Sequence, residues 1–322
     1  MMTKHSGVIY LDDTMQEKGI FLPDGTFESD KHIKRKLSAE LPIMETPKKF
    51  PRDFGYWSDR FQRSQELYKE TSDIETDHVT IRFKGDTVIN FIGDCHVGAT
   101  TTHYDRLEKE ISAIVDTPNS YVVLVGDLVD GYFFNPAQME EVAQAPEQFL
   151  YMHALINHLA NNKKLLIAFG GDHCGWAKKM GIDPYEDMSK IGAYYMHGIG
   201  HLTAKVNDQE YKITGAHRLP GFSYFNNTHP LARAAREVQG ADIYFSAHTH
   251  QKGHSESAIK EFGGEARRTH FISMGAYKPT DEYLRKIGFA QLNEKEMYGC
   301  AIKLLADSKE VVYYDDILKA NE

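Results

Sequence analysis

The sequence predicts an α/β protein, built on a largely parallel or mixed sheet that helices cover on both faces. Short apolar runs such as VINFI, YVVLV and LLIAF are typical of strands that are buried on both sides. Stretches with apolar residues at helical spacing separate these runs, and this alternation of strand and helix favours parallel pairing. The motifs that end these runs, described below, indicate that the strands also position a site.

Strands and helices alternate from residue 78 onward, and a Lys84-Gly85-Asp86 turn joins the first two strands. Two later strands resemble a hairpin around Asn207-Asp208, and the last two should pair with each other. The predicted strands are Val79–Phe83, Thr87–Ile92, Tyr121–Val125, Leu165–Phe169, Leu202–Val206, Tyr211–Thr214, Ile243–Ser246, Thr269–Ser273, Ala301–Leu305 and Val311–Tyr314. The predicted helices are Tyr104–Val115, Gln138–Asn161, with Val142 on its inner face, and Ala232–Val238.

The first 78 residues lack this alternation, so we predict an N-terminal extension over 1–78 and one large domain, which would carry the catalytic site, over 79–322. Between Lys31 and Glu70 the extension carries ten Lys/Arg against six Asp/Glu, interleaved with aromatic residues. This pattern suits an arm that contacts nucleic acid or a partner subunit. It equally suits an extension that packs its aromatic side chains on the main domain. A helix is expected over Ser58–Thr71, with Ser58 as its N-cap.

Composition limits the class of protein. The net charge of −9 argues against a protein that holds nucleic acid over its whole surface, although a local basic groove stays open. The three cysteines are too few for a disulfide framework, and the N-terminus does not resemble a secretion signal. We therefore expect a cytoplasmic protein. No apolar run is long enough to span a membrane. The sequence leaves the oligomeric state open, a homo-oligomer included.

Each of five predicted strands ends in a motif that contains Asp or His. The motifs are GDCH (93–96), GDLVD (126–130), GGDHC (170–174), GAH (215–217) and SAHTH (246–250). Because sites in open α/β sheets gather at the carboxyl ends of strands, we expect these motifs to form one site. In the first motif, a chain that stays extended past Gly93 would place Asp94 and His96 on the same side. Carboxylate and imidazole ligands then converge, which predicts a metal site.

The candidate ligands outnumber the positions around a single cation, which suggests two metals. They are Asp94, His96, Asp127, Asp172, His217, His248 and His250. Two ions roughly 3.5–4 Å apart can hold a bridging hydroxide and clamp a phosphoryl group, so that no Ser or Cys nucleophile is needed. Mixed His/Asp ligands favour Mn²⁺, leave Fe²⁺, Zn²⁺ or Mg²⁺ open, and disfavour Ca²⁺.

The ordered set of motifs resembles the calcineurin-like metallophosphoesterases, which include protein phosphatases, cyclic-nucleotide phosphodiesterases and the Mre11/SbcD nucleases. The resemblance covers roughly residues 85–275. It implies a four-layer αββα sandwich with two mixed β-sheets. It also implies a metal-dependent phosphoric ester hydrolase with two divalent ions.

Carried over by position, the resemblance assigns roles to the motif residues. Asp94, His96 and His250 hold the first metal, Asp127 bridges, and Asp172, His217 and His248 hold the second. His173 looks like the family's substrate-facing histidine, which stabilises the transition state or protonates the leaving oxygen. Asp130 matches an acid that usually supports a ligand rather than binding metal itself.

Two positions depart from the family pattern. Asp172 stands where the family usually has Asn, and Ala247 stands where it has Gly; we treat the second change as neutral. The extra carboxylate should tighten metal binding and make the bridging water harder to deprotonate. Asp172→Asn should therefore weaken metal retention and shift the acid limb of the pH–rate profile to lower pH.

The loop after His217 is polar, aromatic and broken by Gly and Pro, as specificity loops often are. Within it and the helix that follows, Arg218, Arg233 and Asn226 are candidate substrate-binding residues, since Arg binds phosphate oxygens well. The arginines could instead pair with nearby acids. We expect a phosphodiester substrate, with DNA or RNA as the polymer to test. A phosphomonoesterase or nucleotide hydrolase is the alternative, and a non-catalytic binding module on the same fold is the second.

Overall fold

The chain divides into two units, residues 1–69 and 70–322. The structure is a computed structural model that describes residues 9–10, 19–21, 27–29, 54–72, 77–131, 141–179, 193–221, 223, 225–260, 264–280, 285–286, 288 and 293–322. The first unit contains a three-stranded antiparallel sheet of β1 (Ile9–Tyr10), β2 (Gly19–Phe21) and β3 (Phe27–Ser29). Most of the basic, aromatic stretch that begins at Lys31 lies outside the described residues. The boundary expected at residue 78 stays a prediction.

The helix α2 (Phe54–Ser72) begins four residues before the predicted N-cap at Ser58. The expectation that Ser58 caps this helix is therefore wrong. Phe54 and Phe61 on this helix are exposed, and Trp57 stacks on Phe61 with ring centroids 6.1 Å apart. Aromatic pairing of this kind provides local packing that a capping signal alone does not reveal.

The second unit carries the remaining strands and helices. Its strands are β4 (His78–Phe83), β5 (Thr87–Ile92), β6 (Ser120–Val125), β7 (Leu165–Phe169), β8 (Tyr194–Met196), β9 (Gly200–Val206), β10 (Gln209–Ala216), β11 (Ile243–Ser246), β12 (Gly253–Lys260), β13 (Ala266–Ser273), β14 (Cys300–Leu304) and β15 (Val311–Tyr314). Its helices are α3 (Tyr104–Asp116), α4 (Ala145–Asn161), α5 (Asp172–Lys179), α6 (His229–Glu237) and α8 (Ile317–Ala320), with a 3₁₀ turn η3 (Glu294–Glu296). All ten predicted strands and all three helices predicted for this unit are present.

These strands form two mixed six-stranded sheets. One has the order β15-β14-β5-β6-β7-β8, and the other has the order β12-β13-β11-β10-β9-β4. In the first sheet β5, β6, β7 and β8 run parallel to one another. Strand β14 pairs antiparallel with β5, and β15 pairs antiparallel with β14. In the second, β10, β11 and β13 run parallel and β12 is antiparallel. The five strands that precede the motifs therefore form two parallel groups: β5, β6 and β7 in the first sheet, and β10 and β11 in the second.

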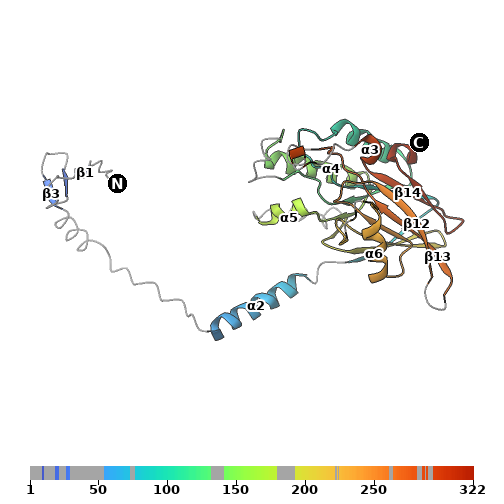
Figure 1. The fold of residues 1–322 in the computed structure, drawn as a ribbon, viewed down its shortest axis with the longest axis horizontal. Coiled ribbons are helices and arrows are strands. Elements are labelled where there is room, and N and C mark those ends of the chain that lie inside the picture. The colour runs from blue at the N-terminus through green and yellow to red at the C-terminus, as the bar shows by residue number, and fades with distance from the viewer. Residues whose placement is uncertain are drawn as a thin grey trace. The chain divides into compact units, whose positions relative to one another are not determined.

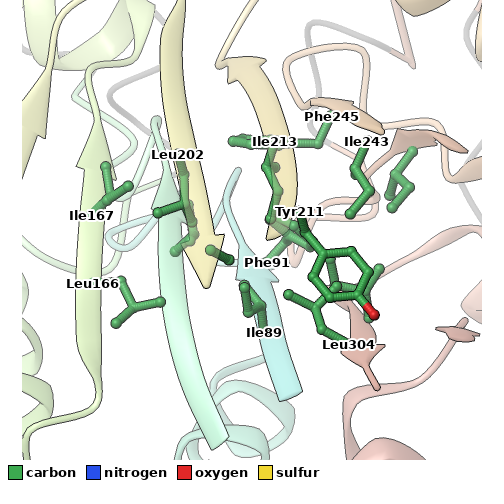
Figure 2. Packing of buried hydrophobic residues seen from close by; sticks show 14 of the residues in the cluster. Ile89, Phe91, Leu166, Ile167, Leu202, Tyr211, Ile213, Ile243, Phe245 and Leu304 are labelled. Atoms are coloured by element: carbon green, nitrogen blue, oxygen red, sulfur yellow. The ribbon is translucent and has the colours of Figure 1, made fainter. Parts of the chain in front are cut away.

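The two sheets pack face to face through a shared apolar core. Side chains from β5, such as Ile89 and Phe91, meet Ile213 and Phe245 from the opposite sheet (Figure 2). The Phe91 and Phe245 rings lie 4.7 Å apart. A second cluster joins α3 and α4 to the outer face of the first sheet, and a third joins α6 to the other sheet. Figure 1 accordingly shows α3 and α4 on one side of the sheets and α6 on the other. This is the predicted four-layer αββα sandwich.

Helix α4 begins later than predicted, at Ala145 instead of Gln138. Gln144 and Glu147 form a capping box, and Pro146 occupies the first turn, where its missing N–H costs nothing. Val142 precedes this helix and is 62% exposed, so its expected place on the inner face is wrong. Pro146 marks the start of the helix, a signal that outweighs the apolar spacing upstream.

Strands β4 and β5 lie in different sheets, although only a short turn separates them. The sequence prediction missed β8, β12 and α5, and also the short helix α8, the turn η3 and the three strands β1 to β3. The strand β12 is polar and half-exposed along its length, so it has no apolar run to reveal it. None of the helices that the structure describes has the length and apolarity needed to cross a membrane.

Candidate metal centre

The five motifs meet at one edge of the sandwich, where loops after strands of both sheets face each other. His217 follows β10 and its Nδ1 donates to the Val125 carbonyl of β6, 2.9 Å away. The His248 amide, after β11, donates to Asp94 Oδ2 at 2.7 Å. These hydrogen bonds cross between the sheets. They bring residues more than 90 positions apart in the chain to one place.

Glycine allows this close approach. A Cβ at Gly126, whose φ is +72°, would lie 2.5 Å from His217 Nδ1. A Cβ at Gly171 would lie 2.2 Å from Asp127 Oδ1. Both distances are far below van der Waals contact, so the glycines of the second and third motifs make room for the polar side chains.

The backbone at the motifs is not extended, contrary to the sequence prediction. Asp94 and His96 have φ values of 47° and 48°, and Asp127 has 45°. The two histidines after β11, His248 and His250, also have positive φ. Strand alternation therefore does not place Asp94 and His96 on one side; two left-handed turns do. Left-handed backbone in non-glycine residues is uncommon and gathers at functional sites.

The predicted ligands form two adjacent groups. In the first, ligand atoms of Asp94, His96 and His250 all lie within 4.8 Å of one another. His96 Nε2 and His250 Nε2 are 3.0 Å apart, close to the ~3.0 Å expected between neighbouring ligands of an octahedral ion with bonds of about 2.1 Å. In the second group, Asp127, His217 and His248 meet the same limit. His217 Nε2 lies 3.0 Å from Asp127 Oδ2.

Two buried atoms in these groups indicate that the donor sets fit cations. Asp94 Oδ1 and His217 Nε2 are buried and make no hydrogen bond within the part of the chain that the structure describes. Leaving a buried carboxylate oxygen and a buried ring nitrogen without a hydrogen bond is costly. Both atoms point at the other members of their groups, where a divalent cation would satisfy them.

Protonation in the metal-free chain is consistent with this fit. Burial raises the pKa of Asp94 to about 7, and the nearby carboxylates of Asp127 and Asp172 add to the rise. Burial lowers the pKa of both His96 and His250, so these imidazoles are neutral, the form that binds metal.

His217 behaves differently from the other histidines. Burial alone would lower its pKa, but Asp127 and Asp94 outweigh burial and raise it to about 9. Burial likewise opposes ionisation of Asp127, yet the positive charge of His217, whose Nε2 lies 3.0 Å from Asp127 Oδ2, holds the pKa of Asp127 below its usual range. The proton on His217 Nε2 must leave before that nitrogen can bind a cation.

Asp130 supports the first group and is itself held by a lysine that the sequence prediction missed. His96 Nδ1 lies 2.9 Å from Asp130 Oδ1, and Lys278 Nζ lies 2.8 Å from the same oxygen. All three side chains are 3–4% exposed. His96, Asp130 and His173 are also close enough to hold an ion, but the Lys278 ammonium opposes a cation there. Lys278 follows β13, whose end carries no Asp or His, so no motif in the sequence marks this lysine.

His173, the predicted substrate-facing histidine, lies next to Asp127 of the second group and His96 of the first. Its Nδ1 contacts the Asp130 carbonyl oxygen, and its Nε2 lies 4.0 Å from Asp127 Oδ2. The ring stacks on Trp176, with centroids 4.4 Å apart, and the His173 amide donates to Asp127 Oδ1. If Nδ1 carries the proton toward the carbonyl, Nε2 is left facing the metal groups.

Asp172 lies at the rim of the second group. Its Oδ2 is 3.4 Å from His248 Nδ1 and 3.2 Å from Arg218 Nη1. The side chains of Asp172 and Arg218 are 42% and 63% exposed, so solvent screens their attraction. The structure thus brings Arg218 to the site through an acid that the sequence predicts as a ligand.

The other two candidate substrate residues take part in local contacts. Arg233 Nε lies 3.2 Å from Glu237 one helical turn later, which is the acid pairing that the sequence left open. Asn226 Oδ1 accepts hydrogen bonds from the amide and hydroxyl of Thr228, just before α6. Neither contact places these side chains at the metal groups.

Comparison with known proteins identifies the family. The family model for calcineurin-like phosphoesterases matches residues 87–252, which is more than half of the 322-residue chain. No curated protein shows a significant match.

Several solved structures are similar over most of their length. They include a Sphaerobacter thermophilus metallophosphoesterase (15% identity, 71% of this chain, 87% of that one, TM-score 0.36), Bacillus subtilis YfkN (15%, 72%, 91%, 0.36) and Chaetomium thermophilum Vps29 (13%, 71%, 98%, 0.35). The family assignment rests on the sequence match across residues 87–252, which spans all five motifs. The chain belongs to the calcineurin-like phosphoesterases.

Proposed function

We propose that this protein hydrolyses a phosphodiester with the help of two divalent cations. The observation that carries the proposal is the pair of adjacent donor groups, Asp94/His96/His250 and Asp127/His217/His248. Asp127, a member of the second group, would bridge the two cations, and Asp172 reaches the second group beside His248. Mn²⁺ is the preferred metal for this ligand set, with Fe²⁺, Zn²⁺ and Mg²⁺ as alternatives.

The cations, when bound, would supply Lewis acidity and bring the pKa of water toward neutrality, so that hydroxide is the nucleophile. The residues of the chain hold and orient the reacting groups. Asp130, fixed by Lys278, keeps His96 in the tautomer whose Nε2 faces the first group. As an imidazolium, protonated on both nitrogens, His173 would offer its Nε2–H as the acid for the leaving oxygen or as a donor to the phosphoryl group.

The substrate class is inferred from Arg218 and from the composition of residues 31–70. Arg218 is exposed beside Asp172 at the rim, where a guanidinium could bind a phosphate oxygen. The basic, aromatic composition of residues 31–70 and the aromatic residues exposed on α2 suit a polymer, so we propose nucleic acid as the substrate to test first. A phosphomonoester or nucleotide is the competing substrate. The three cysteines are buried, and their small number suits a reducing cytoplasm.

Parallel hydrolysis assays with Mn²⁺ test the proposal. The substrates are bis-p-nitrophenyl phosphate, p-nitrophenyl phosphate and a labelled single-stranded oligonucleotide, with His173→Ala as the matched variant. Cleavage of the diester and the oligonucleotide, lost in the variant, is the expected result. Cleavage of the monoester alone would replace the proposal by the phosphomonoesterase. A pure protein that takes up no Mn²⁺ would favour the non-catalytic binding module.

A further inference from the structure

A second set of potential metal ligands lies on the β12–β13 hairpin, outside the candidate metal centre. His254 and Glu256 are two residues apart on β12, so they point to the same face of the sheet. Glu256 lies directly opposite His270 of β13, and His254 is opposite Ile272. The three side chains therefore form a compact triangle across two strands. The sequence alone indicates no ligand role for them, because β12 has no strand signal and cross-strand register is invisible in it.

The spacing of the three donor atoms fits a tetrahedral cation. His254 Nε2 and His270 Nδ1 are 3.3 Å apart, and His270 Nδ1 lies 3.7 Å from Glu256 Oε1. All three atoms lie within 4.8 Å of one another. A tetrahedral ion with bonds of 2.0–2.1 Å holds its ligands about 3.3–3.4 Å apart. The His254–His270 distance matches this value, and the exposed Glu256 carboxylate would have to move closer to complete the ligand set.

The surroundings hold the rings and leave the carboxylate oxygen available. The His254 ring stacks on Tyr313 of β15, with centroids 4.1 Å apart. His270 is 3% exposed, whereas the Glu256 side chain is 40% exposed, so solvent reaches the triangle from one side. Arg268 pairs with Oε2 of Glu256 at 3.4 Å, which leaves Oε1 facing His270. The Arg268 side chain is 76% exposed, so its charge is well screened.

We propose that His254, Glu256 and His270 form a binding site for one Zn²⁺ ion, separate from the candidate metal centre. Two imidazoles and a carboxylate, with an open fourth position, are a ligand set that Zn²⁺ uses in proteins. Burial lowers the pKa of both histidines, which keeps them neutral and ready to bind. The ion would join β12, an edge strand, to β13 and so reinforce the sheet edge next to Tyr313.

The number of Zn²⁺ ions bound per chain tests this proposal. The full-length protein is saturated with Zn²⁺, freed of excess metal by gel filtration and analysed by mass spectrometry for metal content. Glu256→Gln removes the charge at nearly constant shape, and His254→Ala removes a ring nitrogen. Glu265→Gln, the same change at an exposed position near the end of the hairpin, is the control. We expect the wild-type and control proteins to bind one more Zn²⁺ per chain than either variant.

This difference does not depend on how many ions the candidate metal centre holds, because the variants leave all of its predicted ligands in place. Hydrolysis of bis-p-nitrophenyl phosphate should therefore be equal in the four proteins. Zn²⁺ should also raise the melting temperature of the wild type more than that of Glu256→Gln. Unchanged Zn²⁺ content in Glu256→Gln would overturn the proposal, whatever His254→Ala does. The three side chains would then form only a hydrogen bond between His254 and His270 beside the ion pair of Glu256 and Arg268.

Discussion

Replacing Lys278 by methionine should destabilise the protein strongly, although the residue lies far from any predicted ligand in the sequence. The Lys278 ammonium lies 2.8 Å from Asp130 Oδ1, and both side chains are at most 4% exposed. Methionine keeps the apolar stem and removes the charge. Breaking a buried ion pair from one side costs about 3–5 kcal/mol. Because His96 still bonds to the same oxygen, we expect the lower end, about 3 kcal/mol.

Thermal and urea unfolding of the metal-free protein, followed by circular dichroism, measures this cost. For a domain of this size a loss of about 3 kcal/mol corresponds to a melting temperature lower by roughly 6–12 °C. Lys205→Met is the matched control, since its ammonium pairs with Glu210 at 3.4 Å on the surface. Exposed pairs contribute at most about 1 kcal/mol.

A double-mutant cycle identifies the cause of the destabilisation. Adding Asp130→Asn to Lys278→Met removes the buried carboxylate that the first change leaves behind. The double variant should therefore be more stable than the sum of the two single losses predicts. Equal unfolding free energies for Lys278→Met and Lys205→Met would refute the reasoning. So would strictly additive losses in the cycle.

The remaining predictions concern metal binding. Asp130→Asn should lower the affinity for Mn²⁺ about 10–100-fold in calorimetry, since it replaces the carboxylate that orients and polarises His96 by a neutral amide; an unchanged affinity would exclude this role. Mn²⁺ should bind at least about tenfold more weakly at pH 6 than at pH 8, because the buried Asp94, with a pKa of about 7, must lose its proton first; equal affinities would contradict this. Asp172→Asn should lose metal faster during dialysis and move the acid limb of the pH–rate profile to lower pH. Unchanged metal retention and an unchanged profile would show that Asp172 is only the partner of Arg218.

The fold was predictable where burial leaves a pattern in the sequence. Strands such as β5 and β6 are buried along nearly their whole length, and their unbroken apolar runs identified them. The polar edge strand β12 left no such pattern. The late start of α4 was encoded by Pro146 and the capping box, but apolar spacing further upstream suggested a longer helix.

The grouping of the predicted ligands could be expected from the sequence, because ligand chemistry is a property of side chains and five strand ends carry Asp or His. Partners that are not ligands were harder to find. Lys278 reaches Asp130 from across the fold, and nothing in its neighbouring sequence marks it. The pairing of Arg218 with Asp172 likewise depends on the meeting of two loops that are 46 residues apart.

The convergence of Asp94 and His96 was predicted from the sequence, but the backbone conformation expected to produce it was wrong. Alternation along an extended strand would orient Asp94 and His96 by default, whereas the structure uses left-handed residues at both positions. Such conformations cost of the order of 1–3 kcal/mol each, so the surroundings must hold them. Here the amides of Asp94 and His96 donate to the Gly126 and Asp127 carbonyls of the neighbouring motif, at 3.1 and 3.0 Å. The second motif therefore stabilises the strained backbone of the first, and Asp94 and His96 are preorganised by main-chain hydrogen bonds that residue identities alone do not reveal.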